Sequence, residues 1–158
     1  GKVFDDRDRV GNKNLETFLT EEKIKLNCDA DSWEDAIKIA GNILLKNKSI
    51  EASYVNEMID SVRKNGSYMV IAGKIALPHA RTSESILKTD MSLVSLAKAV
   101  VFPGNKEVKI ILPFGSIDQS EHVEALGQLV TLVEDYDFVE FVQKAKSPQE
   151  IIEYIKSK

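Results

Sequence analysis

Apolar residues recur along this chain with two different periods, and the order of the two patterns constrains the fold. Continuous or alternating apolar runs typical of strands cover residues 23–28, 68–77, 91–102 and 108–114. Apolar residues at helical spacing cover residues 33–48, 51–64, 119–134, 138–144 and 148–156. Because the order shows no strict strand–helix alternation, we predict an α/β fold in which a mixed β-sheet is flanked by helices in a single domain.

Turn and cap residues mark the ends of several of these elements. Ser32 is a predicted N-cap, and Asn65-Gly66 predicts a left-handed cap at the end of the next helix. The SPQE segment that starts at Ser147 is a capping box with proline at the first helical position. The turn PGNKE at 103–107 lets the strands on either side pair as a hairpin, and residues 15–19 can form a short helix.

Composition excludes several classes of protein. The chain has 158 residues, 43% of them hydrophobic, which suits one domain with one core. Its 21 basic and 25 acidic residues give a formal net charge of −4, so we expect no nucleic-acid partner and no attraction to an anionic membrane. We also expect no membrane insertion, because no apolar run is long enough to span a bilayer.

The single cysteine bears on the cellular location, and the polar N-terminus bears on where the folded domain starts. Cys28 alone allows no internal disulfide and no cysteine-rich zinc site, which favours a cytoplasmic location. Residues 1–14 are charged and lack apolar periodicity, so we interpret them as a linker or an expression remnant. The folded domain is predicted to span residues 15–158.

One of the two histidines, His79, follows the apolar run 68–77. Pro78 cannot donate a hydrogen bond to a central strand, so the strand should end there and His79 should begin a loop. Neutral imidazole is a nucleophile and a base near neutral pH. The nearby cation and hydroxyl groups that suit a phosphoryl group belong to Arg81, Thr82, Ser83 and Ser85.

The other histidine, His122, belongs to an apolar stripe at helical spacing and is predicted to lie in a first helical turn capped by Asp118 or Ser120. The positive end of the helix dipole disfavours imidazolium, so His122 should stay neutral. From the residues alone, the favoured interpretation of His122 is a structural histidine with one satisfied nitrogen.

The segments GKIALPHAR, LKTDMSLVSL and SEHVEAL together resemble the phosphorylation-site region of enzyme IIA domains of the sugar phosphotransferase system, type 2, which includes the ascorbate and mannitol/fructose types. The resemblance extends from Leu15 to Ile155. It implies a mannitol-type enzyme IIA fold. It also implies that His79 receives phosphate from the phosphocarrier HPr and passes it to a cysteine or histidine of enzyme IIB, with no metal and no cofactor.

The resemblance further assigns His122 as a second active-site histidine that orients the phosphate. Arg63 lies sixteen residues before His79, where mannitol-type domains carry an active-site arginine. Ascorbate-type members tend to have lysine there, so Arg81 can share the role, and Arg63 can instead complement its helix dipole. The 103–107 loop departs from the family because it is shorter than the usual acidic, glycine-rich loop, which affects partner contacts made there.

Two alternatives remain from the sequence. Similar domains occur in transcription regulators of sugar operons, where phosphorylation of the same histidine changes the activity of the regulator. An unrelated hydrolase or metal enzyme built on His79, His122 and Glu124 is the third hypothesis, although two histidines without a clustered third ligand are a weak metal site. The phosphorylated nitrogen of His79 and the transported sugar stay open.

Overall fold

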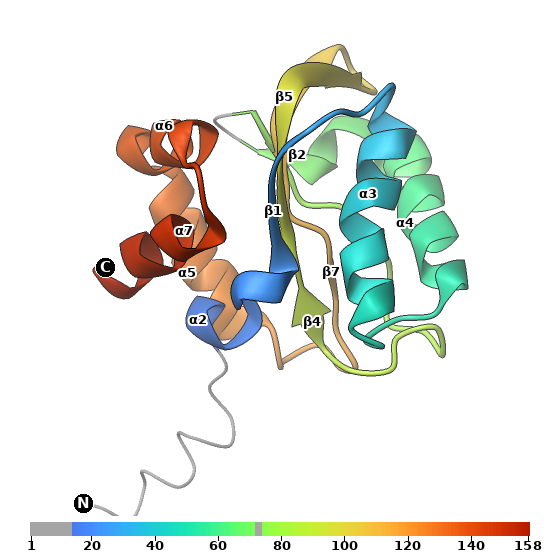
Figure 1. Cartoon of the computed structure of the whole chain (residues 1–158). Coiled ribbons are helices and arrows are strands. Elements are labelled where there is room, and N and C mark those ends of the chain that lie inside the picture. Colours follow the sequence, from blue (N-terminus) through green and yellow to red (C-terminus); the bar gives the residue numbers. More distant parts are fainter. Residues whose placement is uncertain (1–13, 72–73) are drawn as a thin grey trace, which may run out of the picture.

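A computed structural model describes residues 14–71 and 74–158, and in this part of the chain a five-stranded sheet forms the centre of the fold (Figure 1). The strand order is β1-β5-β6-β3-β2. The strands are β1 (Ile24–Cys28), β2 (Val70–Ile71), β3 (Ile75–Ala76), β5 (Leu93–Phe102) and β6 (Lys106–Ile111). The sheet is mixed: β1 runs parallel to β5, β3 runs parallel to β6, and the other pairs are antiparallel.

Helices cover both faces of this sheet (Figure 1). One face carries α3 (Trp33–Lys46) and α4 (Ala52–Asn65). The opposite face carries α2 (Leu15–Phe18), α5 (Val123–Val133), α6 (Tyr136–Lys144) and α7 (Pro148–Lys156). Short 3₁₀ turns, η1 (Glu21–Lys23) and η2 (Gly66–Met69), precede β1 and β2. The predicted mixed sheet flanked by helices is therefore confirmed.

Two hydrophobic cores result from the alternation of side chains along the strands. On β6, Ile110 packs with the helices on the α5 side, and the next residue, Ile111, packs with those on the α3 side. Leu93 and Val94 on β5 divide in the same way. All four side chains are fully buried, and each such burial contributes roughly 1.5–3 kcal/mol relative to exposure.

The hairpin and the side-chain caps at Ser32 and Ser147 are present, but Glu150 accepts from the N–H of Lys146 and not from that of Ser147, so the capping box is incomplete. Ser32 and Ser147 accept hydrogen bonds from the backbone N–H groups three residues later, and Gly66 ends α4 with a φ of 57°. Gly104 and Asn105 take positive φ values of 88° and 59° in the turn between β5 and β6.

Three predictions made from the sequence differ from the structure. Residues 68–77 do not form one strand, because the chain reverses through Lys74 at a φ of 64° and β2 pairs antiparallel with β3. The predicted helix from residue 119 begins only at Val123, so His122 is its N-cap residue. Most of the predicted linker lies outside the described residues, but Asn14 belongs to the fold, since its side chain caps α2.

The predicted strands 91–102 and 108–114 are also each divided. β4 (Asp90–Met91) leaves the main sheet and pairs antiparallel with β7 (Phe114–Gly115), with Asp90 opposite Gly115 and Met91 opposite Phe114. No helix of the described residues is both long and apolar enough to cross a membrane.

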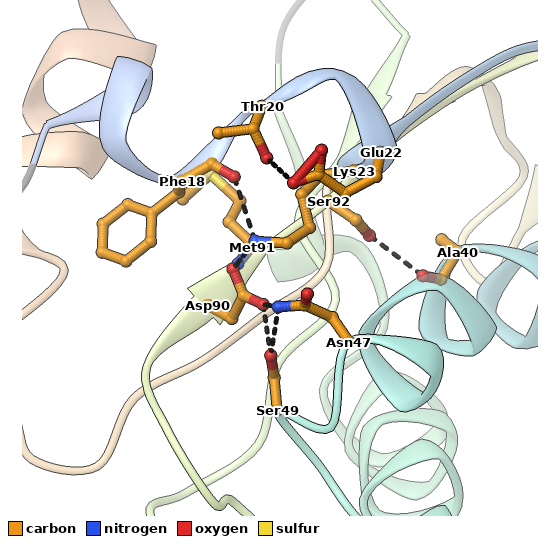
Figure 2. A network of polar contacts seen from close by, with 10 residues as sticks. All are labelled: Phe18, Thr20, Glu22, Lys23, Ala40, Asn47, Ser49, Asp90, Met91 and Ser92. Carbon is orange, nitrogen blue, oxygen red and sulfur yellow. Dashed lines mark hydrogen bonds and ion pairs between the residues drawn. The ribbon is translucent and has the colours of Figure 1, made fainter.

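A buried ion pair holds the β4 end of this small sheet (Figure 2). The Lys23 ammonium lies 2.5 Å from the Asp90 carboxylate and donates a second bond to the carbonyl of Phe18. Asp90 also accepts hydrogen bonds from the Asn47 amide, the Ser49 hydroxyl and the Met91 N–H. The network thus joins η1, the end of α3 and β4, and it compensates the carboxylate for its lost hydration.

Candidate active site

A cleft of about 740 Å³ opens where the loop after β3 meets β7 and the start of α5. Its walls bring together both histidines, although they are far apart in the sequence. The lining residues are Leu77, His79, Ala80, Arg81, Thr82, Phe114, Ser116, Asp118, Gln119, His122 and Leu126.

The His79 imidazole is oriented by the backbone that precedes it. Nδ1 lies 2.8 Å from the carbonyl oxygen of Leu77. A carbonyl can only accept, so Nδ1 carries the proton and the lone pair of the neutral ring resides on Nε2. Nε2 is therefore the ring nitrogen with an available lone pair in this tautomer.

The aromatic ring of Phe114 contacts both histidines. It stacks on His79 at a centroid distance of 4.6 Å and an interplanar angle of 19°. It contacts His122 at 5.0 Å and 35°. Because Phe114 sits on β7, opposite Met91 of β4, the small sheet sets the position of the ring against which both imidazoles pack.

His122 differs from His79 in that its unpaired ring nitrogen, Nδ1, is buried. Of the buried side-chain nitrogen and oxygen atoms in the described residues, only Nδ1 of His122 has no hydrogen-bond partner. Burial lowers the pKa of His122 below its ordinary value, the nearby His79 lowers it further, and Asp118 opposes both effects. The lowered pKa favours a neutral imidazole, which has one nitrogen that donates and one that accepts.

The loop before α5 is held by Asp118. Its carboxylate accepts hydrogen bonds from the backbone N–H groups of Ser120 and Glu121 and from the Ser120 hydroxyl. The bonds with Ser120, then the bond with Glu121, lower the pKa of Asp118. The predicted capping role of Asp118 thus stabilises the turn that delivers His122, while His122 makes no capping bond with its side chain.

The three predicted phosphate-binding residues divide between two neighbouring hollows. Arg81 and Thr82 line the histidine cleft, and the Thr82 hydroxyl donates to the carbonyl of Ser116 across it. Ser83 lines an adjacent hollow that shares Arg81 and Thr82 with the first and also contains Lys64. Arg81 is exposed and is the cation of the histidine cleft.

The structure does not bring Arg63 to the histidine cleft. Its guanidinium lies 3.5 Å from the carboxylate of Glu34 and 3.4 Å from that of Asp60. It also lies over the ring of Trp33, 5.7 Å from the centroid. Arg63 lies in the last turn of α4, where it faces α3, so the structure supports the alternative of a helix-end cation.

Sequence reasoning did not identify Phe114 and Ser116 as cleft residues. Both residues follow β6. The sequence feature that could have indicated them is the segment FGS, at the end of a predicted strand that ran to Phe114.

Among the described residues, no group of three or more histidine, cysteine, aspartate or glutamate side chains is placed to hold a metal ion.

Comparison with known proteins agrees with this fold. Residues 17–158 match the family described as "Phosphoenolpyruvate-dependent sugar phosphotransferase system, EIIA 2". The chain belongs to this family of enzyme IIA domains. It is 33% identical to the ascorbate-specific EIIA component of Escherichia coli K12 over 89% of this chain and 94% of that protein.

Two solved structures show the same fold at similar identity. A protein of Streptococcus pyogenes M1 GAS described as a PTS IIA domain is 30% identical, with a TM-score of 0.85 over 92% of this chain and 97% of that one. The mannitol-specific cryptic phosphotransferase enzyme IIA of Escherichia coli is also 30% identical, with a TM-score of 0.81 over 92% of this chain and all of that one. The resemblance inferred from sequence is confirmed.

Proposed function

We propose that this protein is a phosphocarrier that holds a phosphoryl group on Nε2 of His79, receiving it from HPr and passing it to an enzyme IIB. The observation that carries the proposal is the hydrogen bond of Nδ1 to the Leu77 carbonyl, which leaves the Nε2 lone pair free in a cleft that also contains Arg81 and His122. Membership in the enzyme IIA family supports the choice of partners.

The transfer requires only the residues of the cleft. The Nε2 lone pair attacks phosphorus, the N–P bond forms as the bond to HPr breaks, and the electron pair of that bond stays with HPr. The attacking imidazole of His79 becomes positive, and the Leu77 carbonyl stabilises it through the Nδ1 proton. The second transfer reverses these changes when a nucleophile of IIB attacks the same phosphorus.

Three groups are placed to stabilise the charge on the transferred oxygens. Arg81 supplies a permanent cation, the His122 imidazole offers a hydrogen bond, and the Thr82 hydroxyl can donate once it releases the Ser116 carbonyl. His122 binds an oxygen only through a nitrogen that carries a proton, so the proposal assigns it a donating tautomer when phosphate is present. The name of the relative from Escherichia coli makes an ascorbate-type IIB the first partner to test.

The test is phosphorylation with phosphoenolpyruvate, enzyme I and HPr. We expect an acid-labile phosphate on the wild-type protein, no label on His79→Ala, and transfer of the label to an ascorbate-type IIB. Absence of label on the wild type would refute the proposal. Labelling of His79 with no transfer to any IIB tested would instead favour the regulatory alternative, in which the same phosphohistidine controls a transcription regulator.

A further inference from the structure

Tyr54 on α4 connects the two segments that form the cleft, although it does not line the cleft itself. Its side chain is fully buried in the core on the α3 and α4 side of the sheet. The hydroxyl accepts a hydrogen bond from the N–H of Ala80 at 3.0 Å and donates to the carbonyl of Phe114 at 2.9 Å. One side-chain atom thus joins the residue after His79 to the residue whose ring contacts both histidines.

The Tyr54 ring is held as closely as its hydroxyl. A Cβ at Gly115 would lie 3.2 Å from Cε2 of Tyr54 and 3.3 Å from Cγ1 of Ile86, so the ring packs against the backbone of β7. Burial raises the pKa of Tyr54 to about 12. The hydroxyl therefore keeps its proton, and with it the bond to Phe114, at every pH at which the protein works.

Backbone hydrogen bonds alone leave this junction incomplete. The N–H of Phe114 donates to the carbonyl of Pro78 at 3.1 Å, which aligns β7 with the chain before His79. After His79 the chain leaves the sheet, and the Ala80 N–H is directed to the Tyr54 hydroxyl. His79 is thus anchored on one side by Pro78 and on the other by Tyr54.

We infer that Tyr54 is a positioning residue for phosphoryl transfer, whose hydroxyl sets the placement of the His79 imidazole relative to Phe114 and His122. The inference rests on the proposed function of His79. Tyr54 touches neither imidazole, so it acts through Ala80 and Phe114. Because group transfer depends steeply on alignment, a small displacement of His79 slows the reaction markedly.

The test compares Tyr54→Phe with Tyr154→Phe. Each variant loses one hydroxyl, and the hydroxyl of Tyr154 donates to Asp135 away from the cleft. We expect Tyr54→Phe to accept phosphate from HPr roughly 10- to 100-fold more slowly, while still labelling on His79, and Tyr154→Phe to react at the wild-type rate. Rates are measured at a temperature at which circular dichroism shows both variants fully folded.

A second measurement separates positioning from stability. Imidazole ¹⁵N NMR of the unphosphorylated protein reports the Nδ1–H tautomer of His79, and we expect Tyr54→Phe to shift or broaden these signals while Tyr154→Phe leaves them unchanged. A lower urea midpoint for Tyr54→Phe with unchanged rate and unchanged His79 signals would overturn the inference. If wild-type protein takes no label, the proposed function fails, and the NMR comparison alone decides whether Tyr54 positions His79.

Gly115→Ala serves if Tyr54→Phe does not fold. It keeps the hydroxyl but forces the Tyr54 ring or Ile86 to move by a few tenths of an ångström. We expect a slowing of a few-fold with altered His79 signals. A Gly115→Ala protein with the wild-type rate and wild-type His79 signals would then overturn the inference.

Discussion

Two polar clusters lie at the two strands of the same small sheet, and they differ in how completely their groups are paired. On β4, Asp90 accepts four hydrogen bonds, one of them from the Lys23 ammonium, and both side chains are nearly inaccessible to water. Next to β7, the histidine cleft is open, and Nδ1 of His122 has no partner among the described residues. Met91 and Phe114, which face each other across the sheet, connect the two clusters.

The comparison shows what pairing achieves in each place. A buried charge whose hydrogen bonds are all satisfied holds one arrangement of α3, η1 and β4. It leaves no donor or acceptor unpaired to bind a ligand. A cleft that keeps one donor or acceptor unpaired gives up some stability but retains a site for a ligand. The first cluster fixes the strand on which the second depends, so changes in the two should affect different measurements.

The largest expected effect is on stability. Asp90→Ala leaves the Lys23 ammonium buried without its carboxylate, and we expect the free energy of unfolding to fall by about 3–5 kcal/mol, measured by urea denaturation. The matched control is Glu107→Ala, which breaks the exposed ion pair between Glu107 and Lys74. This control should lose less than about 1 kcal/mol.

Equal losses in the two variants would contradict the distinction between a buried and an exposed pair. A Lys23→Met, Asp90→Leu double variant should recover most of the loss, because it removes both charges together.

The second prediction concerns the rate of phosphoryl transfer, not stability. His122→Ala should slow phosphoryl transfer to His79 by roughly 100-fold, because it removes one donor to the transferred oxygens, while His79 still takes the label. His122→Gln, whose amide can donate, should recover part of the rate. His122→Gln should leave the urea midpoint nearly unchanged, since Nδ1 is unpaired in the free protein, whereas His122→Ala also loses the ring contact with Phe114. An unchanged transfer rate would make His122 structural.

The third prediction concerns Arg81, the cation of the histidine cleft. Arg81→Ala should slow transfer about tenfold. Arg81→Lys should slow it less, because lysine keeps the charge, but it should not match the wild type, because lysine lacks the planar fork of donors. The measurement is the initial rate of labelling by phospho-HPr at low salt. A rate independent of the residue at position 81 would remove Arg81 from the proposed site.

The fourth prediction concerns pH. Burial, then the charge of His79, lowers the pKa of His122 below its ordinary value of 6.5. Between the lowered value and 6.5 the unfolded chain binds more protons at this residue than the folded protein, so stability should fall as pH decreases through that window. Urea midpoints measured across pH 5–8 should decline less on the acid side in His122→Gln. An identical pH dependence would show that protonation of His122 is not coupled to folding.

The smallest effect is expected from Arg63→Ala. Arg63 pairs with Glu34 and Asp60 at the surface, so the variant should lose no more than about 1 kcal/mol of stability. Its rate of labelling should match that of the wild type, because Arg63 does not line the cleft. A large loss of rate with normal stability would restore the catalytic role predicted from the sequence.

Much of this fold could be predicted because it follows from local rules. Ser32 and Ser147 cap helices where the sequence places them, and the 103–107 turn joins two strands as expected. The failures are at residues whose local pattern was overruled by pairing at a distance. The run 68–77 is apolar throughout, but β2 and β3 pair with each other, and β4 separates from β5 to pair with β7.

The candidate site likewise contains some residues that the sequence indicated and others that it did not. Pro78 before His79, and Asp118 before His122, were sufficient to place two histidines at the ends of elements, and the family resemblance associated them. Arg63 was assigned by its spacing from His79, but spacing does not specify which side of α4 a residue faces. Phe114 and Tyr54 carried no motif, because their importance comes from contacts with residues that are distant in the chain.

The sequence by itself therefore determined most of the order of strands and helices, the position of His79 directly after Pro78, and the family, since each depends on neighbouring residues. Only the tertiary structure decided that Nε2 of His79 is the free nitrogen, that Phe114 contacts both imidazoles, and that Tyr54 links Ala80 to Phe114. These features depend on a carbonyl, a ring and a hydroxyl reaching particular points in space. Such positions are set by the packing of the whole sheet and its helices, and no local pattern encodes them.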